Sequence, residues 1–197
     1  MSDEGSVGGE IFTVPLMGGT VRNLTPKINS SPSTLVWTSP DRILFGENVD
    51  GKSGFASVSA SGGAVQKIWS GEESVSAQSS LNGAVSRDGS VSAVIRQSAS
   101  TPPELWTGPI GNWKQLTSLN AGIKPAWGET VNFHWTNGKL PLQGWLMLPL
   151  NYAPGKRYPL VVNVHAHAQT SATRQADLSA HQPPSNRKAA PFLQGAA

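Results

Sequence analysis

The sequence contains no cysteine, which excludes disulfides, thiolate nucleophiles and cysteine metal sites. It also lacks any apolar run that approaches the length of a membrane span. The start, MSDEGSVGGEIF, has acidic residues where a secretory signal needs a basic segment followed by an apolar one. As written, the sequence predicts a cytoplasmic chain with no membrane partner.

Charged residues are scarce and unevenly distributed. Residues 1–136 hold nine Lys/Arg and eleven Asp/Glu, whereas residues 137–197 hold six Lys/Arg and a single acid, Asp177. The formal charge of +3 therefore originates in the last third, where basic residues form no dense run and do not alternate with aromatic ones. This pattern argues against nucleic-acid binding.

Turn-forming residues are abundant, with 21 Gly and 15 Pro, and seven Trp stand among few other aromatic residues. No long stretch has a helical period. This composition favours a mainly β protein with many turns.

A repeat occupies the first two thirds of the sequence. EIFTVPLMGGTVRNLT (10–25) aligns without gaps on GFASVSASGGAVQKIW (54–69), and ELWTGPIGNWKQLT (104–117) is a looser third copy. Each copy alternates apolar and polar residues, turns at glycine and alternates again, which predicts a hairpin with one buried face. Matched positions are Val14 with Val58, Gly18-Gly19 with Gly62-Gly63, Val21 with Val65 and Leu24 with Ile68, while Gly111, Trp113 and Leu116 take the places of Gly63, Val65 and Ile68.

Between the copies lie two further strand pairs, with turns at Asp41 and at Asp88-Gly89. The predicted unit is four short strands over about 40–50 residues, the size of a β-propeller blade. Residues 8–120 would supply about two blades and the closing hairpin of another. A small β-sandwich with accidental repetition is the alternative.

The pattern changes after residue 120. Val131–Trp135 and Leu142–Leu148 flank Asn137-Gly138, which predicts a hairpin with a loosened loop. Leu160–Val164 is a continuous apolar run, typical of a strand covered on both faces.

Three segments, VSRDGSVSAVIRQSASTPPELW, LTSLN and LQGWLMLPLNYAPGKRYPLVVNVH, resemble the prolyl oligopeptidase family of serine peptidases, in its dipeptidyl-peptidase and acylaminoacyl-peptidase branch. The resemblance covers residues 8–165. Members join a β-propeller to a C-terminal α/β-hydrolase domain. It implies a partial propeller over residues 1–120, a linker and the first hydrolase strands over 121–165, and a non-homologous, disordered tail over 166–197.

In the family, a Gly-Gly-Pro loop beside the oxyanion hole follows the strand that ends here at His165, but this sequence has Ala166-His167-Ala168. His165 is therefore expected to be only a remnant of that loop's edge. The family nucleophile sits in a Gly-x-Ser-x-Gly elbow, and its Asp and His partners follow downstream. The sequence contains no such elbow, so we predict no catalytic residue, no cofactor and no metal.

The last thirty-two residues are rich in Ala, Gln, Pro, Ser and Arg, with Phe192 as their sole aromatic. We interpret them as the product of a frameshift or gene fragmentation after His165; a genuine disordered tail is the alternative. A metal site on His165 and His167, with Asp177 and His181, is possible on paper, as is a Ser179–His181–Asp177 combination. Both are disfavoured, because neighbours in a tail without a fold lack fixed geometry.

Histidine outside the tail and tryptophan are the remaining candidates for a binding site. His134 is expected to be a strand residue on a hairpin face, and the seven tryptophans are expected to pack between blades and domains.

The resemblance implies that intact relatives cleave short peptides by acyl transfer, in a cytoplasmic or exported location, with no cofactor. This chain alone is expected to be an inactive part of such a peptidase. The alternative is a stand-alone β-repeat binding module. In either case, exposed blade edges would favour self-association or aggregation.

Overall fold

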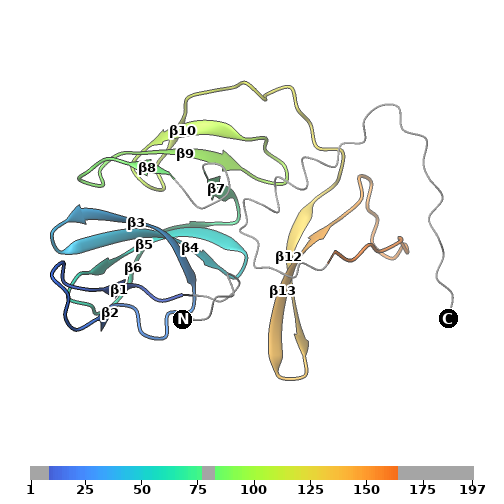
Figure 1. Ribbon diagram of the computed structural model, residues 1–197. Helices are drawn as coiled ribbons and strands as arrows, with labels where there is room; N and C mark the ends of the chain where they lie inside the picture. Colours follow the sequence, from blue (N-terminus) through green and yellow to red (C-terminus); the bar gives the residue numbers. More distant parts are fainter. Residues whose placement is uncertain (1–8, 77–82, 164–197) are drawn as a thin grey trace.

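The computed structural model describes residues 9–76 and 83–163, and all regular elements in them are β-strands (Figure 1). No helix in this part of the chain is long and apolar enough to cross a membrane. The strands pair antiparallel in four separate sheets, so the prediction of a mainly β protein is confirmed. In chain order the strands are β1 (Phe12–Thr13), β2 (Arg22–Asn23), β3 (Ser31–Ser39), β4 (Arg42–Val49), β5 (Lys52–Ser59), β6 (Gln66–Gly71), β7 (Ser74–Ser76), β8 (Ala84–Val85), β9 (Ser92–Gln97), β10 (Glu104–Gly108), β11 (Lys114–Gln115), β12 (Thr130–Asn137) and β13 (Leu140–Met147).

The four sheets are named here by their position. The N-terminal hairpin is β1–β2, the middle sheet is β3–β6 in chain order, and the C-terminal hairpin is β12–β13. In the outer sheet the order is β11-β10-β9, and β7 and β8 pair with successive parts of β9. Two units of four strand positions therefore follow each other, as the repeat predicts.

The middle sheet lies between the N-terminal hairpin on one face and the outer sheet on the other (Figure 1). Side chains alternate across a strand, so β4 and β5 place the register partners Phe45 and Ala56 on one face and Phe55 on the other. Two apolar cores result. The first consists of Ile11, Leu24, Ile43, Phe45, Ala56 and Val58. The second consists of Phe55, Val75, Val94 and Trp113, with Trp69, Trp106 and Ile110 packed against it.

The three predicted repeat hairpins are all present, as β1–β2, β5–β6 and β10–β11. In the first two copies the turn is closed by the same hydrogen bond, and Gly18 and Gly62 both have a φ of 83°. The third copy turns differently. Its closing hydrogen bond is donated by Asn112, and Gly111, with a φ of 85°, directly precedes it. In φ Gly111 is closer to the first glycine of the pair than to Gly63, its predicted match, but it lies one position before the donor of the closing hydrogen bond.

Burial does not follow the repeat, and the prediction of a hairpin with one buried face is wrong for β5, which is buried on both faces. Leu24 is fully buried, but its matches Ile68 and Leu116 are exposed. Val58 is fully buried, whereas Val14 is exposed. The physical reason is that a strand face is buried only where another sheet covers it. Among the described residues, the middle sheet is the one with a neighbour on both faces.

The tryptophans divide into two groups. Three of the seven pack in or against the second core, as predicted. Trp127 donates its Nε1–H to the Ala99 carbonyl at 2.9 Å. Trp37 and Trp135 are instead about half exposed, so the packing prediction is wrong for them within the described part of the chain.

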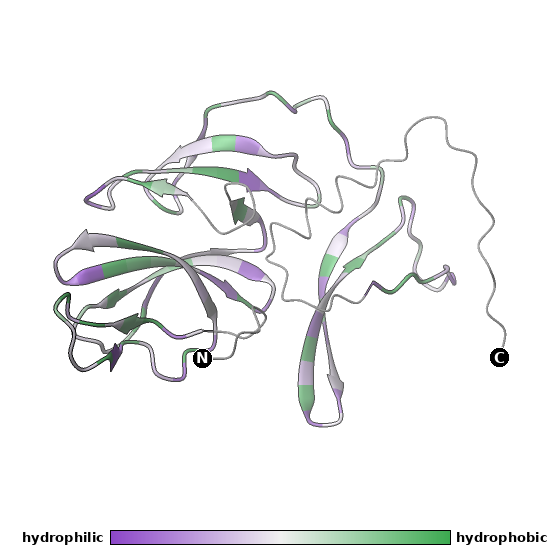
Figure 2. Cartoon of the chain, in the orientation of Figure 1, coloured by the Kyte–Doolittle hydropathy of each residue, from purple (hydrophilic) through white to green (hydrophobic). Residues whose placement is uncertain are grey.

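The C-terminal hairpin confirms the strand pair predicted around Asn137-Gly138. Its loop is tighter than predicted, because Asn137 pairs with Leu140 and only two residues lie between them. Gly138 has a φ of 62° and the next residue does not have a positive φ, which is the pattern of a type II′ turn. Hydrophobic and hydrophilic residues succeed each other along the C-terminal hairpin (Figure 2), and Val131, Asn132, Phe133 and His134 of β12 alternate as a strand with two different faces requires.

The predicted strand at Leu160–Val164 is not found. Residues 160–163 belong to no strand, and Val161 is 89% exposed; Val164 lies outside the described residues. An apolar strand needs hydrogen-bonded neighbours and covered faces. The nearest candidates, β12 and β13, pair only with each other in the described chain, which leaves the run without a sheet.

Two carboxyl groups fix turns in the outer sheet. Asp88 accepts hydrogen bonds from the hydroxyls of Ser86 and Ser90 and from the Ser90 N–H, and these bonds lower its pKa from 3.8 to about 2. Glu104 is buried and accepts from the Thr117 hydroxyl and the Asn120 N–H. The Thr117 bond is the main cause of its lowered pKa.

We expect the thermal stability of the protein to fall as the pH falls from about 4 to about 2. A depressed native pKa contributes stability above the unfolded pKa, and that contribution is lost as the carboxyl is protonated at the native pKa, which for Asp88 is about 2. The measurement is Tm against pH for the wild type and for Asp88→Ala, which should show a shallower fall over this range. Ser86→Ala, which removes the donor with the largest effect, should flatten the profile in the same direction. Parallel profiles for all three proteins would contradict the assignment.

Candidate functional site

The candidate site begins at the turn between β4 and β5. Val49 pairs with Lys52, so Asp50 and Gly51 form a two-residue loop. Both have positive φ, 53° and 75°, the pattern of a type I′ turn, which matches the twist of the flanking strands. Aspartate is among the few non-glycine residues that adopt this conformation readily. The turn therefore places a carboxylate at one end of the middle sheet.

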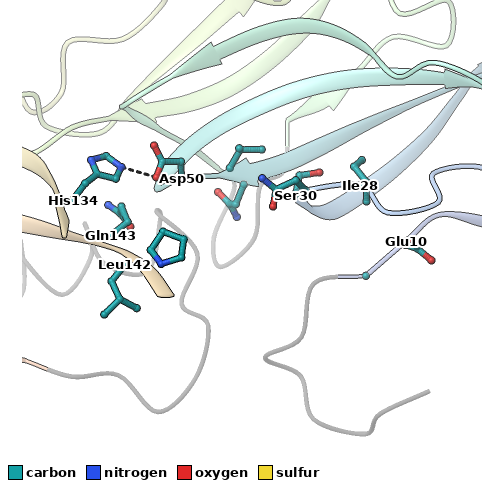
Figure 3. A pocket seen from close by; sticks show the side chains of 12 residues that line it. Glu10, Ile28, Ser30, Asp50, His134, Leu142 and Gln143 are labelled. Carbon is teal, nitrogen blue, oxygen red and sulfur yellow. Dashed lines mark hydrogen bonds and ion pairs between the residues drawn. The ribbon is translucent and has the colours of Figure 1, made fainter. Parts of the chain in front are cut away.

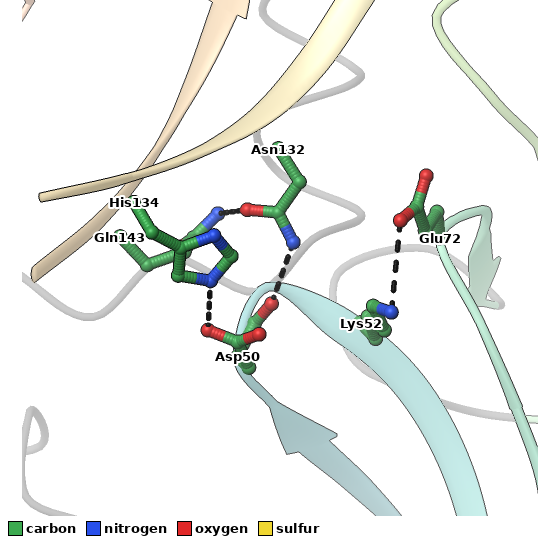
Figure 4. Close-up of polar contacts among 6 residues, drawn as sticks. All are labelled: Asp50, Lys52, Glu72, Asn132, His134 and Gln143. Atoms are coloured by element: carbon green, nitrogen blue, oxygen red, sulfur yellow. Dashed lines mark hydrogen bonds and ion pairs between the residues drawn. The ribbon is translucent and has the colours of Figure 1, made fainter.

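The C-terminal hairpin supplies the opposite side of the site. Asn132 and His134 lie two residues apart in β12, so they share a face, and Gln143 of β13 is the register partner of His134. All three polar side chains lie at the Asp50 turn (Figure 4).

Hydrogen bonds connect these side chains to the turn. His134 Nε2 lies 2.7 Å from Asp50 Oδ1, and the Asn132 amide donates to the Asp50 carbonyl at 3.0 Å. The Gln143 amide donates to Asn132 Oδ1 at 2.6 Å, which orients the asparagine. The contact thus bridges 84 positions of sequence between Asp50 and His134.

Gly51 is required here by two independent constraints. Its positive φ is strained for any other residue. A Cβ at this position would also lie 2.5 Å from Gln143 Nε2. A side chain at residue 51 would therefore displace Gln143 from Asn132.

The ionic part of the contact is weak. The side chains of His134 and Asp50 are each about half exposed, and solvent-exposed pairs contribute only about 0.2–1 kcal/mol. Lys52 and Glu72 form a second exposed pair beside the turn, at 3.6 Å (Figure 4). The amide hydrogen bonds of Asn132 and Gln143 determine the geometry more than charge does.

A cleft of about 640 Å³ opens beside this contact, between the middle sheet and the C-terminal hairpin (Figure 3). Its lining, among residues 9–76 and 83–163, includes two carboxylates, Glu10 and Asp50, and no lysine or arginine. Apolar side chains such as Ile28 and Leu142 complete the wall. The Glu10 carboxylate already accepts hydrogen bonds from the Asn23 side chain and the Lys27 N–H.

The His134–Asp50 pair has the residue types of two members of a Ser-His-Asp triad, in which a carboxylate beside an imidazole orients the imidazole as a base. The third part would be a nucleophile within hydrogen-bond reach of His134. Ser30 lines the same cleft, but its Oγ is buried and has no hydrogen-bond partner. The described residues therefore hold a structural contact with an imidazole–carboxylate pair, and no serine hydrogen-bonded to it.

The residues that the sequence singled out lie mostly elsewhere. His165, the Ala166-His167-Ala168 replacement and the tail candidates Asp177, Ser179 and His181 lie outside the described residues. Within residues 9–76 and 83–163, no three His, Asp or Glu side chains come close enough together to hold a metal ion. His134 lies on a hairpin face, as predicted. Its partner Asp50 was missed, although Asp50-Gly51 between two alternating segments is a strong hairpin signal.

Comparison with known proteins identifies the fold. No protein-family model matches the sequence, and no curated protein matches it. A structure of "acylaminoacyl peptidase in complex with Z-Gly-Gly-Phe-chloromethyl ketone" is similar at a TM-score of 0.52 and 21% identity, over 72% of this chain and 21% of that one. A Pyrococcus horikoshii acylaminoacyl peptidase is similar at 0.51 and 19% identity, over 71% and 21%. The chain thus spans about a fifth of the length of the structures whose fold it shares over most of its own length.

Proposed function

We propose that the chain corresponds to the later propeller blades and the first hydrolase strands of a serine peptidase related to the prolyl oligopeptidase family, in its dipeptidyl-peptidase and acylaminoacyl-peptidase branch. The observation that supports this most is the order of elements: a four-stranded sheet stacked on a five-stranded one, then a linker and a hairpin, similar in fold to acylaminoacyl peptidases. The TPPELW segment, which enters β10, and the GW…YPLVVNVH segment, which begins in β13, carry the sequence resemblance that supports the same proposal.

In this proposal the Asp50 turn and the C-terminal hairpin form the joint between the propeller part and the hydrolase part. The intact relatives would cleave short peptides through a serine, with the propeller restricting access and no metal or organic cofactor. The sequence given has no Gly-x-Ser-x-Gly elbow in which such a serine could be activated. We therefore propose that this chain does not hydrolyse peptides by itself.

Hydrolysis assays test the proposal. The purified chain should release no detectable product from a chromogenic dipeptide or acyl-aminoacyl anilide, and a fluorophosphonate probe should label no serine. Turnover that is lost on serine-directed inhibition would contradict it. In that event, Ser30→Ala and His134→Ala would tell whether the cleft is responsible, with Ser33→Ala as a matched control, because Ser33 Oγ is also buried and unpartnered but does not line the cleft.

The proposal extends to residues 166–197, which we interpret as translated in a shifted frame. Resequencing of the gene and its flanks, translated in all three frames from the codon of His165, should restore Gly-Gly-Pro and then Gly-x-Ser-x-Gly in another frame. If no frame restores them, the tail is native to the protein. The stand-alone binding module would then be favoured, and the exposed apolar faces at both ends of the stack are the observation that supports it.

A further inference from the structure

Each of the first two repeat hairpins places one apolar residue against the sheet that follows it in the chain. Ile11, before β1, packs into the first core at 3% exposure, and Phe55, in β5, packs into the second at 2%. Leu105 occupies the same place in β10. It is the neighbour of Trp106, which faces the second core, so Leu105 points to the opposite face of the outer sheet, where it is 38% exposed.

That opposite face of the outer sheet forms a small apolar surface. Ile95 is the register partner of Leu105, and the Leu116 N–H bonds to the Leu105 carbonyl, so the three side chains lie on one face. Leu116 is exposed as well. We call Ile95, Leu105 and Leu116 the trailing face.

The other end of the stack has the complementary surface. In the middle sheet, Ala56 and Val58 are the residues that receive the preceding hairpin, and both are fully buried in the first core. Their repeat equivalents in the N-terminal hairpin are Phe12 and Val14, which are 54% and 59% exposed. We call Phe12 and Val14 the leading face.

We propose that copies of this chain associate head to tail, with the trailing face of one copy packed on the leading face of the next. Within the chain, a trailing-type face already packs on a leading-type face twice. The N-terminal hairpin packs on the middle sheet in the first core, and the middle sheet packs on the outer sheet in the second. In the part of the chain that the structure describes, one unmatched face remains at each end of the stack, so a second copy provides a partner for both. The contact joins two different surfaces, so assembly continues beyond a dimer, into a ring where the rotation between copies closes and into an open chain where it does not.

This association goes beyond the proposed peptidase ancestry and does not depend on it. It requires the stacking of sheets only, not catalytic residues. It also differs from edge-to-edge pairing of unpaired strands, because the contact is made by side chains on sheet faces.

Sedimentation velocity of the full chain over about a hundredfold range of concentration tests the proposal. The weight-average mass should rise from the monomer value of 20.7 kDa to more than that of a dimer. Leu105→Arg blocks the trailing face, and Phe12→Arg blocks the leading face. Each variant alone should remain a monomer, since every contact needs one face of each kind.

An equimolar mixture of the two variants gives the sharpest result. It should form a heterodimer and nothing larger, because only one intact face of each kind remains available. Leu160→Arg, at an exposed residue outside the stack, is the matched control and should associate like the wild type. Far-UV circular dichroism and Tm check that each variant folds, and Leu116→Arg and Val14→Arg replace any variant that does not.

Three results would overturn the proposal. One is a wild type that stays at the monomer mass throughout the concentration range. Another is association of either single variant to the same extent as the wild type, which would place the contact at strand edges or elsewhere. The third is an equimolar mixture that remains monomeric while the wild type assembles.

Discussion

Phe55→Ala is expected to lower the free energy of unfolding by about 3–5 kcal/mol. The Phe55 ring is 2% exposed and lies between the middle and outer sheets, with its centroid 6.3 Å from that of Trp69 and 6.2 Å from that of Trp113. Its removal leaves a cavity in the second core, and the rigid sheets on either side can collapse into that cavity only in part. Urea unfolding followed by tryptophan fluorescence measures the effect.

A matched control for this variant is Phe133→Ala. Phe133 is 49% exposed and stacks on Trp135 at 5.8 Å in the C-terminal hairpin. Because little buried area is lost, the change should cost less than about 1 kcal/mol. A comparable small cost for Phe55→Ala would mean that the second core does not hold the two sheets together.

Ser92→Ala is expected to destabilise the protein by about 1–3 kcal/mol, which is large for the loss of one oxygen atom. The buried Ser92 hydroxyl accepts a hydrogen bond from the Trp113 indole at 2.7 Å and donates one to the Gly108 carbonyl at 2.8 Å. Its removal leaves a buried indole N–H and a carbonyl without that partner. The readout is again the free energy of unfolding.

Ser74→Ala provides the contrast, because Ser74 is equally buried and its Oγ has no hydrogen-bond partner. Here the substitution removes a desolvated polar atom and leaves no orphan, so it should be neutral or stabilising. Equal losses for the two serines would show that steric fit, and not hydrogen bonding, determines the stability of this layer.

The sequence was sufficient to predict individual hairpins. Period-two alternation and glycine turns are local signals, and they located β5–β6 and the C-terminal hairpin without any knowledge of the fold. The four-strand unit also followed from a repeat within the sequence itself. What could not be predicted was which faces are covered, because matched residues such as Leu24 and Leu116 have the same side chain and different neighbours.

The candidate site could not be predicted from the sequence, for a related reason. His134 and the Asp50-Gly51 turn each have a local sequence pattern, but no local pattern indicates that segments 84 positions apart are in contact. For the apolar run at residues 160–164 the local pattern was clear, but in residues 160–163 the structure does not follow it. The composition of this run indicates the environment that it would need as a strand, but not whether neighbouring strands are there to provide it.

Because both faces of the middle sheet are covered, this sheet is expected to open last when the molecule unfolds locally. In a stack where each layer contacts only the next, local unfolding starts at the ends and moves inward. Amide protons of β4 and β5, in the interior of that sheet, should therefore exchange with solvent last. Those of the two-strand N-terminal hairpin should exchange early, because no described layer covers its outer face, where Phe12 and Val14 are exposed. The order in which the layers are stacked would then also determine the order in which they open.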